Sequence, residues 1–252
     1  MSNSVSKEDN IQKQNLTIDG RLPKDRPNAR PFRIYIALTN HCNRTCPWCS
    51  TYSSPLGNTF ITLEKFIELC SRDIQFEVQL EGGEPTLHPK FIEMVNYANN
   101  INKCTKIIIV TNGTTIPRKT SKLKEWLLLL GNKAVLKLSI NHYLLDYDCK
   151  LLDLACAIKD VSSCIGSVDL VLNVRLRKDE QEESEAIINE IKKRNLSDVS
   201  NIFWLQKYGK ASDRETWEEP FIVSDHFSLI NPDGSDSGTN LIRRSDTMRS
   251  LP

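Results

Sequence analysis

The stretch "FRIYIALTNHCNRTCPWC" (residues 32–49) joins a β-rich run to a loop that holds Cys42, Cys46 and Cys49. A disulfide uses two such thiols, and a closed zinc site uses four ligands. Three thiolates with no fourth partner suit an iron–sulfur cubane in which one iron stays free to bind a substrate or cofactor. The loop therefore predicts an open metal site directly after the first strand.

Two other interpretations of the cysteines remain, a zinc site and unrelated core residues. A zinc site needs a fourth ligand. His41 is adjacent to Cys42, which is a poor geometry for chelating the same ion, and the next cysteine, Cys70, falls in a predicted helix. Cys149 and Cys156 lie seven residues apart on another predicted helix. We interpret these two as small core residues rather than as ligands of a second cluster.

The composition limits the classes of partner. The 252 residues include 33 Lys and Arg against 32 Asp and Glu, a net charge of +1, which disfavours a protein that mainly binds nucleic acid. No apolar run approaches the roughly 18 residues of a membrane span, and the N-terminus lacks the apolar segment of a secretory signal. Eight cysteines in such a chain are expected to be reduced. We therefore expect a cytoplasmic protein without a membrane segment.

Six β-rich runs alternate with stretches of helical composition. The runs span residues 32–38, 76–81, 106–111, 134–140, 168–176 and 199–206. The helical stretches span residues 62–72, 88–100, 122–131, 151–160 and 183–195. This alternation predicts parallel strands with crossover helices, as a wound sheet or an incomplete barrel. A Rossmann-type sheet is the alternative, although no G-x-G-x-x-G follows the first strand.

Three of the runs have one polar and one apolar face. In "AVLKLSIN" (134–141), for example, Lys137, Ser139 and Asn141 alternate with leucine and isoleucine, and "FEVQLE" (76–81) and "VDLVLNVRLR" (168–177) alternate likewise. If helices cover the apolar faces, the polar faces turn inward. A sheet buried between two helical layers would instead show continuous apolar runs. The pattern favours a barrel with a polar lumen; a sheet with one solvent-exposed face remains the alternative.

The chain is predicted to have three parts. Residues 1–31 are polar, lack apolar periodicity and are expected to form a mobile arm. Residues 32–208 form the α/β part, a partial (β/α)6 barrel similar to an incomplete TIM barrel. Residues 209–252 carry turn residues without a clear period. We expect them to be an irregular tail that caps an open end of the barrel or is partly disordered.

A second motif, "LEGGEPTLHP" (80–89), stands at the end of the second predicted strand. Gly82 and Gly83 let the backbone approach a ligand closely or adopt positive φ. Glu84 places a carboxylate at the carboxyl end of the strand, where it suits an ammonium group. Such a turn alone is usually only a connector between strand and helix.

The two motifs together resemble the radical S-adenosylmethionine (radical SAM) superfamily. "CNRTCPWC" matches the C-x-x-x-C-x-x-C loop of that family, with an aromatic residue, Trp48, before the last cysteine, and "GGEP" follows about 35 residues later. The resemblance covers Phe32 to about Tyr208 and implies a six-strand partial barrel. It also implies one 4Fe–4S cluster, held by the cysteines of the loop, and S-adenosylmethionine (SAM) chelated to the free iron.

The resemblance implies further SAM contacts at the strand ends, where barrels build their active sites. Trp48 would lie near the adenine, and Gly82, Gly83 and Glu84 would hold the methionine ammonium. Ser139 and Asn141 would approach the ribose, although many relatives have Asp in place of Asn141. The remaining assignments are Asn173 and Arg175, near the SAM carboxylate or the substrate, and Asn112, in the "TNG" loop after the third strand.

The implied activity is reductive cleavage of SAM to methionine and a 5′-deoxyadenosyl radical, which removes hydrogen from a polar small-molecule or peptide substrate. An external donor such as flavodoxin or ferredoxin would supply the electron. Three alternatives stay open: an activating enzyme that makes a glycyl radical on a partner protein, a peptide-modifying maturase, and an iron–sulfur protein that has lost the reaction. The intact set of Cys42, Glu84 and Ser139 weighs against the last of these.

Overall fold

The computed structural model describes residues 31–215, 217 and 227–252. Its centre is a seven-stranded sheet in the order β6-β5-β4-β3-β2-β1-β7, in which every pair of neighbouring strands is parallel. The strands are β1 (Phe32–Thr39), β2 (Phe76–Gly82), β3 (Cys104–Thr111), β4 (Ala134–Ile140), β5 (Asp169–Leu176), β6 (Ser200–Trp204) and β7 (Phe227–Ile230). The arm expected at residues 1–31 lies, apart from Pro31, outside the described residues.

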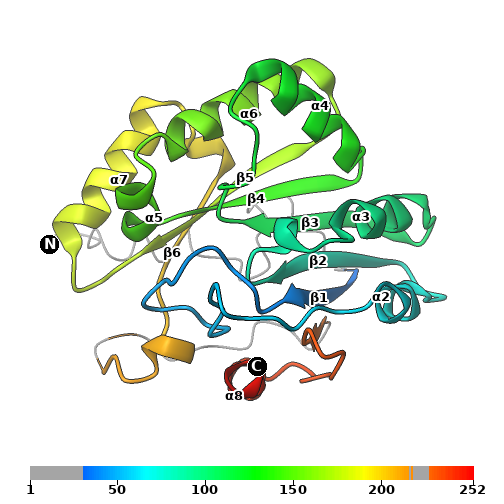
Figure 1. Cartoon of the computed structure of the whole chain (residues 1–252). Helices are drawn as coiled ribbons and strands as arrows, with labels where there is room; N and C mark the ends of the chain where they lie inside the picture. Colours follow the sequence, from blue (N-terminus) through cyan, green and yellow to red (C-terminus); the bar gives the residue numbers. More distant parts are fainter. Residues whose placement is uncertain (1–30, 216, 218–226) are drawn as a thin grey trace, which may run out of the picture.

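Helices connect the strands and cover the outer face of the curved sheet (Figure 1). The α-helices are α2 (Leu63–Cys70), α3 (Phe91–Asn100), α4 (Thr120–Leu130), α5 (His142–Tyr147), α6 (Leu151–Ile165), α7 (Gln181–Lys193) and α8 (Leu241–Ser250). Within the described residues, the short 3-10 helices are η2 (Pro85–Leu87), η3 (Ser197–Val199) and η4 (Gly209–Ala211). Strands β1 to β6 follow each other across the sheet in sequence order, which makes a singly wound partial barrel. A Rossmann sheet would reverse its strand order midway.

The predicted alternation of apolar and polar residues along the strands is confirmed, because the apolar side chains are buried beneath the helices. The outward residues of β1 and β2, among them Ile34, Ile36, Val78 and Leu80, are fully buried in one core cluster beneath the helices. This layer removes apolar surface from water and supplies the main driving force for folding. The opposite faces of β2, β4 and β5 carry the polar residues and turn toward the lumen. On β3 the inward residues are apolar: Ile108 and Val110 join a small separate cluster with Val135 and Val171.

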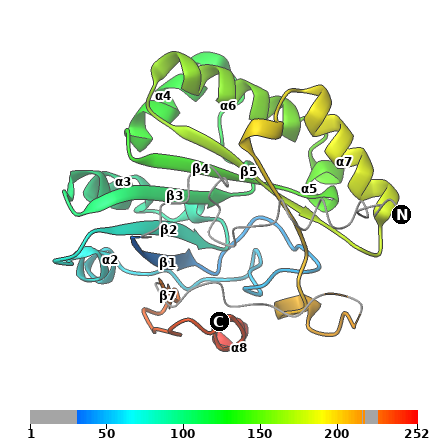
Figure 2. The ribbon, with the colours of Figure 1, turned by 180° about the vertical axis from the view of Figure 1, so that it is seen from behind.

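The tail is more regular than the sequence predicts. After residue 226 the chain forms β7, which pairs in parallel with β1, and then α8, which lies near it (Figure 2). Asn240 caps the first turn of α8 by accepting a hydrogen bond from the Arg243 N–H. The expected irregular tail is therefore corrected to a strand and a helix. Four residues make too short a run for the period of two to be read.

A buried ion pair lies at the start of the inner face. The Arg33 guanidinium on β1 donates to the Glu77 carboxylate on β2, with Nη2 and Oε2 2.5 Å apart. Both side chains are almost fully buried. The two residues are also cross-strand partners in the sheet. Glu77 thus has a structural partner on the adjacent strand, which the sequence pattern alone does not reveal.

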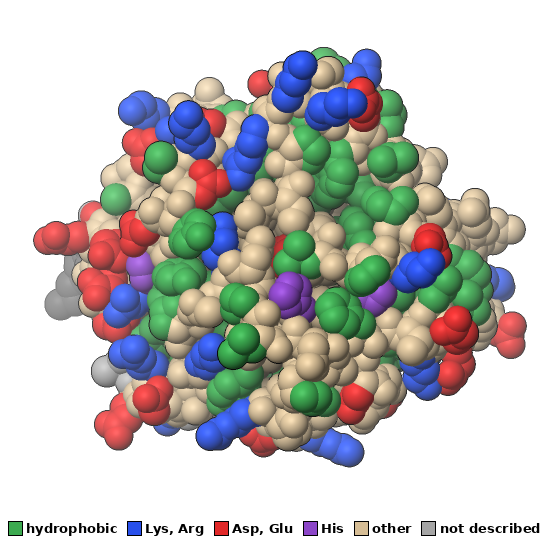
Figure 3. Space-filling view, viewed as in Figure 1, with side chains coloured by type: hydrophobic (Ala, Val, Ile, Leu, Met, Phe, Trp, Pro, Cys, Tyr) green, Lys and Arg blue, Asp and Glu red, His purple; other side chains and the backbone are tan. Residues whose placement is uncertain are grey.

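The surface carries both signs of charge. On the face shown in Figure 3, Lys and Arg side chains alternate with Asp and Glu side chains around the edge. This mixture agrees with the balanced composition. Within the part of the chain that the structure describes, none of the helices has the length and apolar character required to cross a bilayer.

We predict that Arg33→Met lowers the free energy of unfolding by about 3–5 kcal/mol, because it leaves the Glu77 carboxylate buried without its guanidinium partner. Urea denaturation followed by circular dichroism measures the effect. The double variant Arg33→Met/Glu77→Met should recover much of the loss, because it removes both charges. Lys122→Met, which breaks the exposed pair with Glu125, is the control and should cost less than about 1 kcal/mol. Equal costs for the two single variants would contradict the assignment.

Candidate functional site

A cavity of about 380 Å³ opens at the carboxyl ends of the strands. Its walls come from the cysteine loop, the inner face of the sheet and the tail. All the site residues predicted from the sequence line this cavity except Glu84. The volume falls within the usual range for small-molecule and cofactor sites. The structure therefore gathers predicted site residues from five separate segments of sequence around one cavity.

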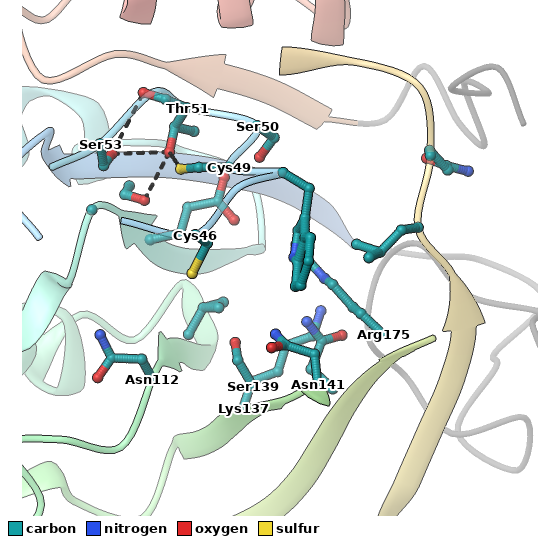
Figure 4. Close-up of a pocket in the computed structure, with 18 of the residues that line it drawn as sticks. Cys46, Cys49, Ser50, Thr51, Ser53, Asn112, Lys137, Ser139, Asn141 and Arg175 are labelled. Carbon is teal, nitrogen blue, oxygen red and sulfur yellow. Dashed lines mark hydrogen bonds between the residues drawn. The ribbon is translucent and has the colours of Figure 1, made fainter. Parts of the chain in front are cut away.

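The cysteine loop forms the upper wall of the cavity (Figure 4). The Cys46 thiol points into the cavity, toward Ser139 and Asn141 on the opposite side. The Cys49 thiol instead turns toward Thr51, with Sγ and Oγ1 3.5 Å apart. Cys42 also lines the cavity. Within the described residues, no three side chains are already arranged as a metal site.

The donor set nevertheless fits an iron–sulfur cluster. Three free thiols lie on one loop and line one cavity. Burial raises the pKa of the Cys42 thiol to about 12, and the charge of the nearby Glu84 adds to this effect. Burial and the nearby Cys49 raise the pKa of Cys46 to about 11. Without a metal the Cys42 and Cys46 thiols stay protonated, and metal binding must displace these two protons.

The glycine turn packs against the start of the cysteine loop. The Gly83 N–H donates to the Thr39 carbonyl oxygen at 2.6 Å, and the Glu84 N–H donates to the His41 carbonyl oxygen at 2.9 Å. A Cβ atom on Gly83 would lie 2.0 Å from that same His41 oxygen. Gly82 has a φ of +118°, which other residues rarely adopt. Both glycines are therefore required for the turn to reach the loop.

Glu84 lies behind this turn, and its carboxylate accepts four hydrogen bonds from the protein. Oε1 accepts from the Thr86 hydroxyl (2.6 Å), the Thr86 N–H (3.3 Å) and the Thr111 hydroxyl (2.8 Å). Oε2 accepts from the Asn112 N–H at 2.8 Å. Burial raises the pKa of Glu84, and these hydrogen bonds offset only part of the increase. In the structure Glu84 does not line the cavity, and its carboxylate joins the ends of β2 and β3. The expected contact between Glu84 and a ligand stays a prediction.

Two of the predicted asparagines also have structural bonds. The Asn112 side chain donates to the Asn43 side-chain oxygen at 3.0 Å and approaches the Cys42 sulfur at 3.8 Å. It therefore links the end of β3 to the cysteine loop. Asn141 caps α5, with its Oδ1 accepting from the Leu144 N–H at 3.0 Å. The Asn141 amide still lines the cavity.

Trp48 lies in an aromatic cluster at one side of the cavity. Its ring centre is 4.7 Å from that of His142, 6.0 Å from Tyr143 and 6.4 Å from Trp217. These contacts hold the indole in place with little freedom. The cluster gives this part of the cavity an apolar wall.

The middle of the lumen holds a second ion pair. The Arg244 guanidinium from α8 donates to the Glu81 carboxylate at the end of β2, and the Gln79 amide donates to the other carboxylate oxygen at 2.5 Å. Burial alone would raise the pKa of Glu81, but the charge of Arg244, the hydrogen bonds and Lys137 bring it below its ordinary value. Glu81 is therefore held as a carboxylate.

Sequence reasoning expected the tail to cap the barrel, but it did not identify which tail residues reach the site. Phe227 and Leu229 of β7, and Leu241 and Arg244 of α8, all line the cavity. No motif marks these residues, because their position depends on the pairing of β7 with β1. Arg44, inside the cysteine motif, also lines the cavity and lies over the Tyr147 ring at 3.5 Å. The position of Arg44 between Cys42 and Cys46 is the feature of the sequence that could have identified it as a site residue.

We predict that Glu84→Ala destabilises the protein even without any ligand, by about 1–3 kcal/mol, because buried donors at Thr111 and Asn112 lose their acceptor. Thermal unfolding of the metal-free protein tests this. Glu93→Ala, on the exposed face of α3, is the matched control and should change stability by less than about 0.5 kcal/mol. If both variants unfold alike, Glu84 does not brace the strand ends.

Comparisons with known proteins identify relatives of this chain. Two curated proteins illustrate the relationships. "Probable GTP 3′,8-cyclase" of Pyrococcus horikoshii is 32% identical over 101 residues, 38% of this chain and 32% of that protein. "GTP 3′,8-cyclase" of Listeria monocytogenes is 31% identical over 114 residues, 42% of this chain and 33% of that protein. The match thus spans about a third of the length of these curated relatives.

Solved structures share the fold at low sequence identity. The structure "Native anSMEcpe with bound AdoMet" has a TM-score of 0.53 and 17% identity over 70% of this chain and 53% of that chain. Streptococcus suis SuiB bound to precursor peptide SuiA has a TM-score of 0.52 and 14% identity over 90% of this chain and 61% of that chain. Residues 36–215 match the Radical SAM superfamily, and because this is well over half of the chain, the protein belongs to that superfamily.

Proposed function

We propose that the cavity at the strand ends is where this radical SAM enzyme binds SAM and cleaves it reductively. The observation that supports the proposal is convergence. The cysteine loop, the Gly82–Gly83 turn and the polar ends of β4 and β5 come from distant parts of the sequence and line one cavity. Membership of the superfamily implies a 4Fe–4S cluster and SAM.

Cys42, Cys46 and Cys49 would hold the cluster. When bound, the cluster supplies the electron that splits SAM into methionine and a 5′-deoxyadenosyl radical. The protein's part is to position the three thiols and to limit access of water. The loop is fixed for this purpose at both ends: the Cys42 N–H donates to the Ser54 carbonyl oxygen at 3.0 Å, and the Lys210 N–H donates to the Cys49 carbonyl oxygen at 3.0 Å. An external donor such as flavodoxin or ferredoxin would reduce the site.

The SAM contacts inferred from the resemblance remain proposals, and the geometry refines them. Gly82 and Gly83 would present the backbone to the methionine ammonium, with Glu84 acting behind them to position the turn. The Trp48 ring would form the wall beside the adenine. The other assigned contacts are those of Ser139 and Asn141 to the ribose, those of Asn173 and Arg175 to a carboxylate or the substrate, and Asn112 at the cluster side.

The substrate is proposed to be a polar small molecule or a peptide. Several buried polar atoms of the cavity wall have no hydrogen-bond partner among the described residues, including both amide atoms of Asn173. Such atoms are costly unless a ligand or water satisfies them. The names of the similar proteins include both possibilities, a GTP cyclase and an enzyme bound to its precursor peptide. A glycyl radical activating enzyme is less well supported, because the site is a concave cavity and not a flat rim.

The state of the cysteines supports a reducing compartment. All eight are free thiols in the structure. Proteins in oxidising compartments tend to use such residues in disulfides. We therefore propose the cytoplasm as the site of action.

The anaerobically reconstituted protein should contain four irons and four sulfides and, with dithionite and SAM, should release 5′-deoxyadenosine and methionine. Iron and sulfide analysis and chromatography of the products measure this. Replacing Cys42, Cys46 and Cys49 together by Ala should abolish both, because the thiolate ligands are lost.

Cys149→Ala is the control for that triple variant. The interpretation of Cys149 as a core residue is wrong, because its side chain is exposed and it precedes α6. It does not line the cavity, so iron content and SAM cleavage should stay at the wild-type level. Protein purified without oxygen that holds tightly bound zinc and takes up no iron would contradict the proposed function.

A further inference from the structure

Arg244 is a buried guanidinium that the proposed SAM site does not use. It stands on α8, is only 5% exposed, and lines the cavity. Its Nη1 group donates to the Glu81 carboxylate. Its Nε and Nη2 groups, by contrast, have no hydrogen-bond partner among the residues that the structure describes. One edge of the guanidinium is therefore used by the protein and another is not.

The unused edge has a defined chemical preference. The Nε–H and the adjacent Nη2–H of an arginine point in the same direction, and their spacing matches two oxygens of a carboxylate or phosphate. A buried donor of a charged group without a partner carries a large desolvation cost. Two such donors side by side on a single buried residue indicate a ligand that supplies two acceptor oxygens.

The ion pair with Glu81 orients this edge. Arg244 is bound on one side, and the Gln79 amide holds the second oxygen of the Glu81 carboxylate at 2.5 Å. This arrangement leaves Gln79 Oε1 without a hydrogen-bond partner among the described residues. Both side-chain amide atoms of Asn173 also lack such a partner there. Both residues line the same cavity as Arg244. The lumen therefore offers a fixed guanidinium edge together with amide donors and acceptors for neighbouring polar groups.

The charges of the cavity wall favour an anion. Among its described residues the wall carries the cations Arg44, Lys137, Arg175 and Arg244, but only one carboxylate, that of Glu81. Glu81 is already bonded to Arg244 and Gln79. An anionic group entering the lumen would therefore meet an excess of positive charge.

We propose that the Nε–Nη2 edge of Arg244 binds an oxyanion group, a carboxylate or a phosphate, of the substrate. The proposal rests on the proposed function, because it names a substrate feature for the same cavity. The depth of Arg244 in the barrel favours the substrate, rather than SAM, as the source of the oxyanion. Glu81 binds the arginine, and Gln79 donates to Glu81. Both residues precede the Gly82–Gly83 turn on β2 and so lie further inside the barrel than the turn.

Isothermal titration calorimetry on the reconstituted protein, without oxygen, tests the proposal. The probes are inorganic pyrophosphate, malonate and, separately, SAM. We expect pyrophosphate or malonate to bind at a single site, and the tighter of the two identifies the class of oxyanion. Arg244→Lys keeps a positive charge near Glu81 but loses the two-donor edge, so affinity for that probe should fall at least tenfold. SAM affinity should fall by less than threefold.

Arg243→Lys is the matched control, because Arg243 is the exposed neighbour on the same helix. It should bind the oxyanion probe as the wild type does. The double variant Glu81→Gln/Arg244→Met removes both charges of the buried pair. This double variant replaces Arg244→Lys in the test if Arg244→Lys does not fold. It should no longer bind the oxyanion probe.

The proposal would be overturned if neither oxyanion bound to wild-type protein that binds SAM. It would also be overturned if Arg244→Lys, or the double variant in its place, bound the probe as well as the wild type does. A third contrary result is that Arg244→Lys lowers the affinity for SAM as much as the affinity for the probe. The last result would assign Arg244 to the SAM carboxylate. Failure of the wild type to cleave SAM would instead refute the proposed function, so the two failures can be told apart.

Discussion

The buried carboxylate of Glu84 is the point on which the site depends. It accepts hydrogen bonds from Thr86, directly after its own turn, and from Thr111 and Asn112 at the end of β3. Asn112 in turn donates to Asn43 in the cysteine loop. One carboxylate thus connects two strand ends and, through a single asparagine, the loop that carries the thiols. Because this carboxylate is buried and accepts four hydrogen bonds, it holds these segments together in the structure without a ligand.

The sequence predicted the barrel because the period of two is visible in its strands. Lys137, Ser139 and Asn141 alternate with apolar residues on β4, and the structure places them on the inner face. The prediction that helices cover the apolar face follows from the same alternation and is confirmed. The inner face of β3 could not be read in this way. Its residues Ile108 and Val110 are apolar, and the run "KIIIVT" carries no alternation to reveal which side faces inward.

The hydrogen-bond partners of Glu84 and the residues that the tail contributes to the cavity could not be predicted, for two different physical reasons. The GGEP motif identifies a carboxylate at a strand end but does not say whether its oxygens face a ligand or neighbouring backbone. That depends on donors 27 and 28 residues away, at Thr111 and Asn112. The tail depends on pairing over an even longer range. Its strand of four residues forms against β1 nearly 200 residues earlier, and a run that short has no period of its own.

The tail and the cysteine loop are hydrogen-bonded to each other. This contact connects the part of the cavity proposed for the substrate to the part proposed for the cluster. The Ser245 hydroxyl donates to the Ser50 carbonyl oxygen at 2.7 Å. Ser50 directly follows Cys49 in the loop, and Ser245 directly follows Arg244 on α8. The same short helix therefore contacts the loop through Ser245 and the lumen through Arg244. In the proposed reaction, a radical formed beside the loop would have to meet its substrate without reaching water. A helix that binds both the loop and the lumen wall closes that side of the cavity and fixes the distance between the two.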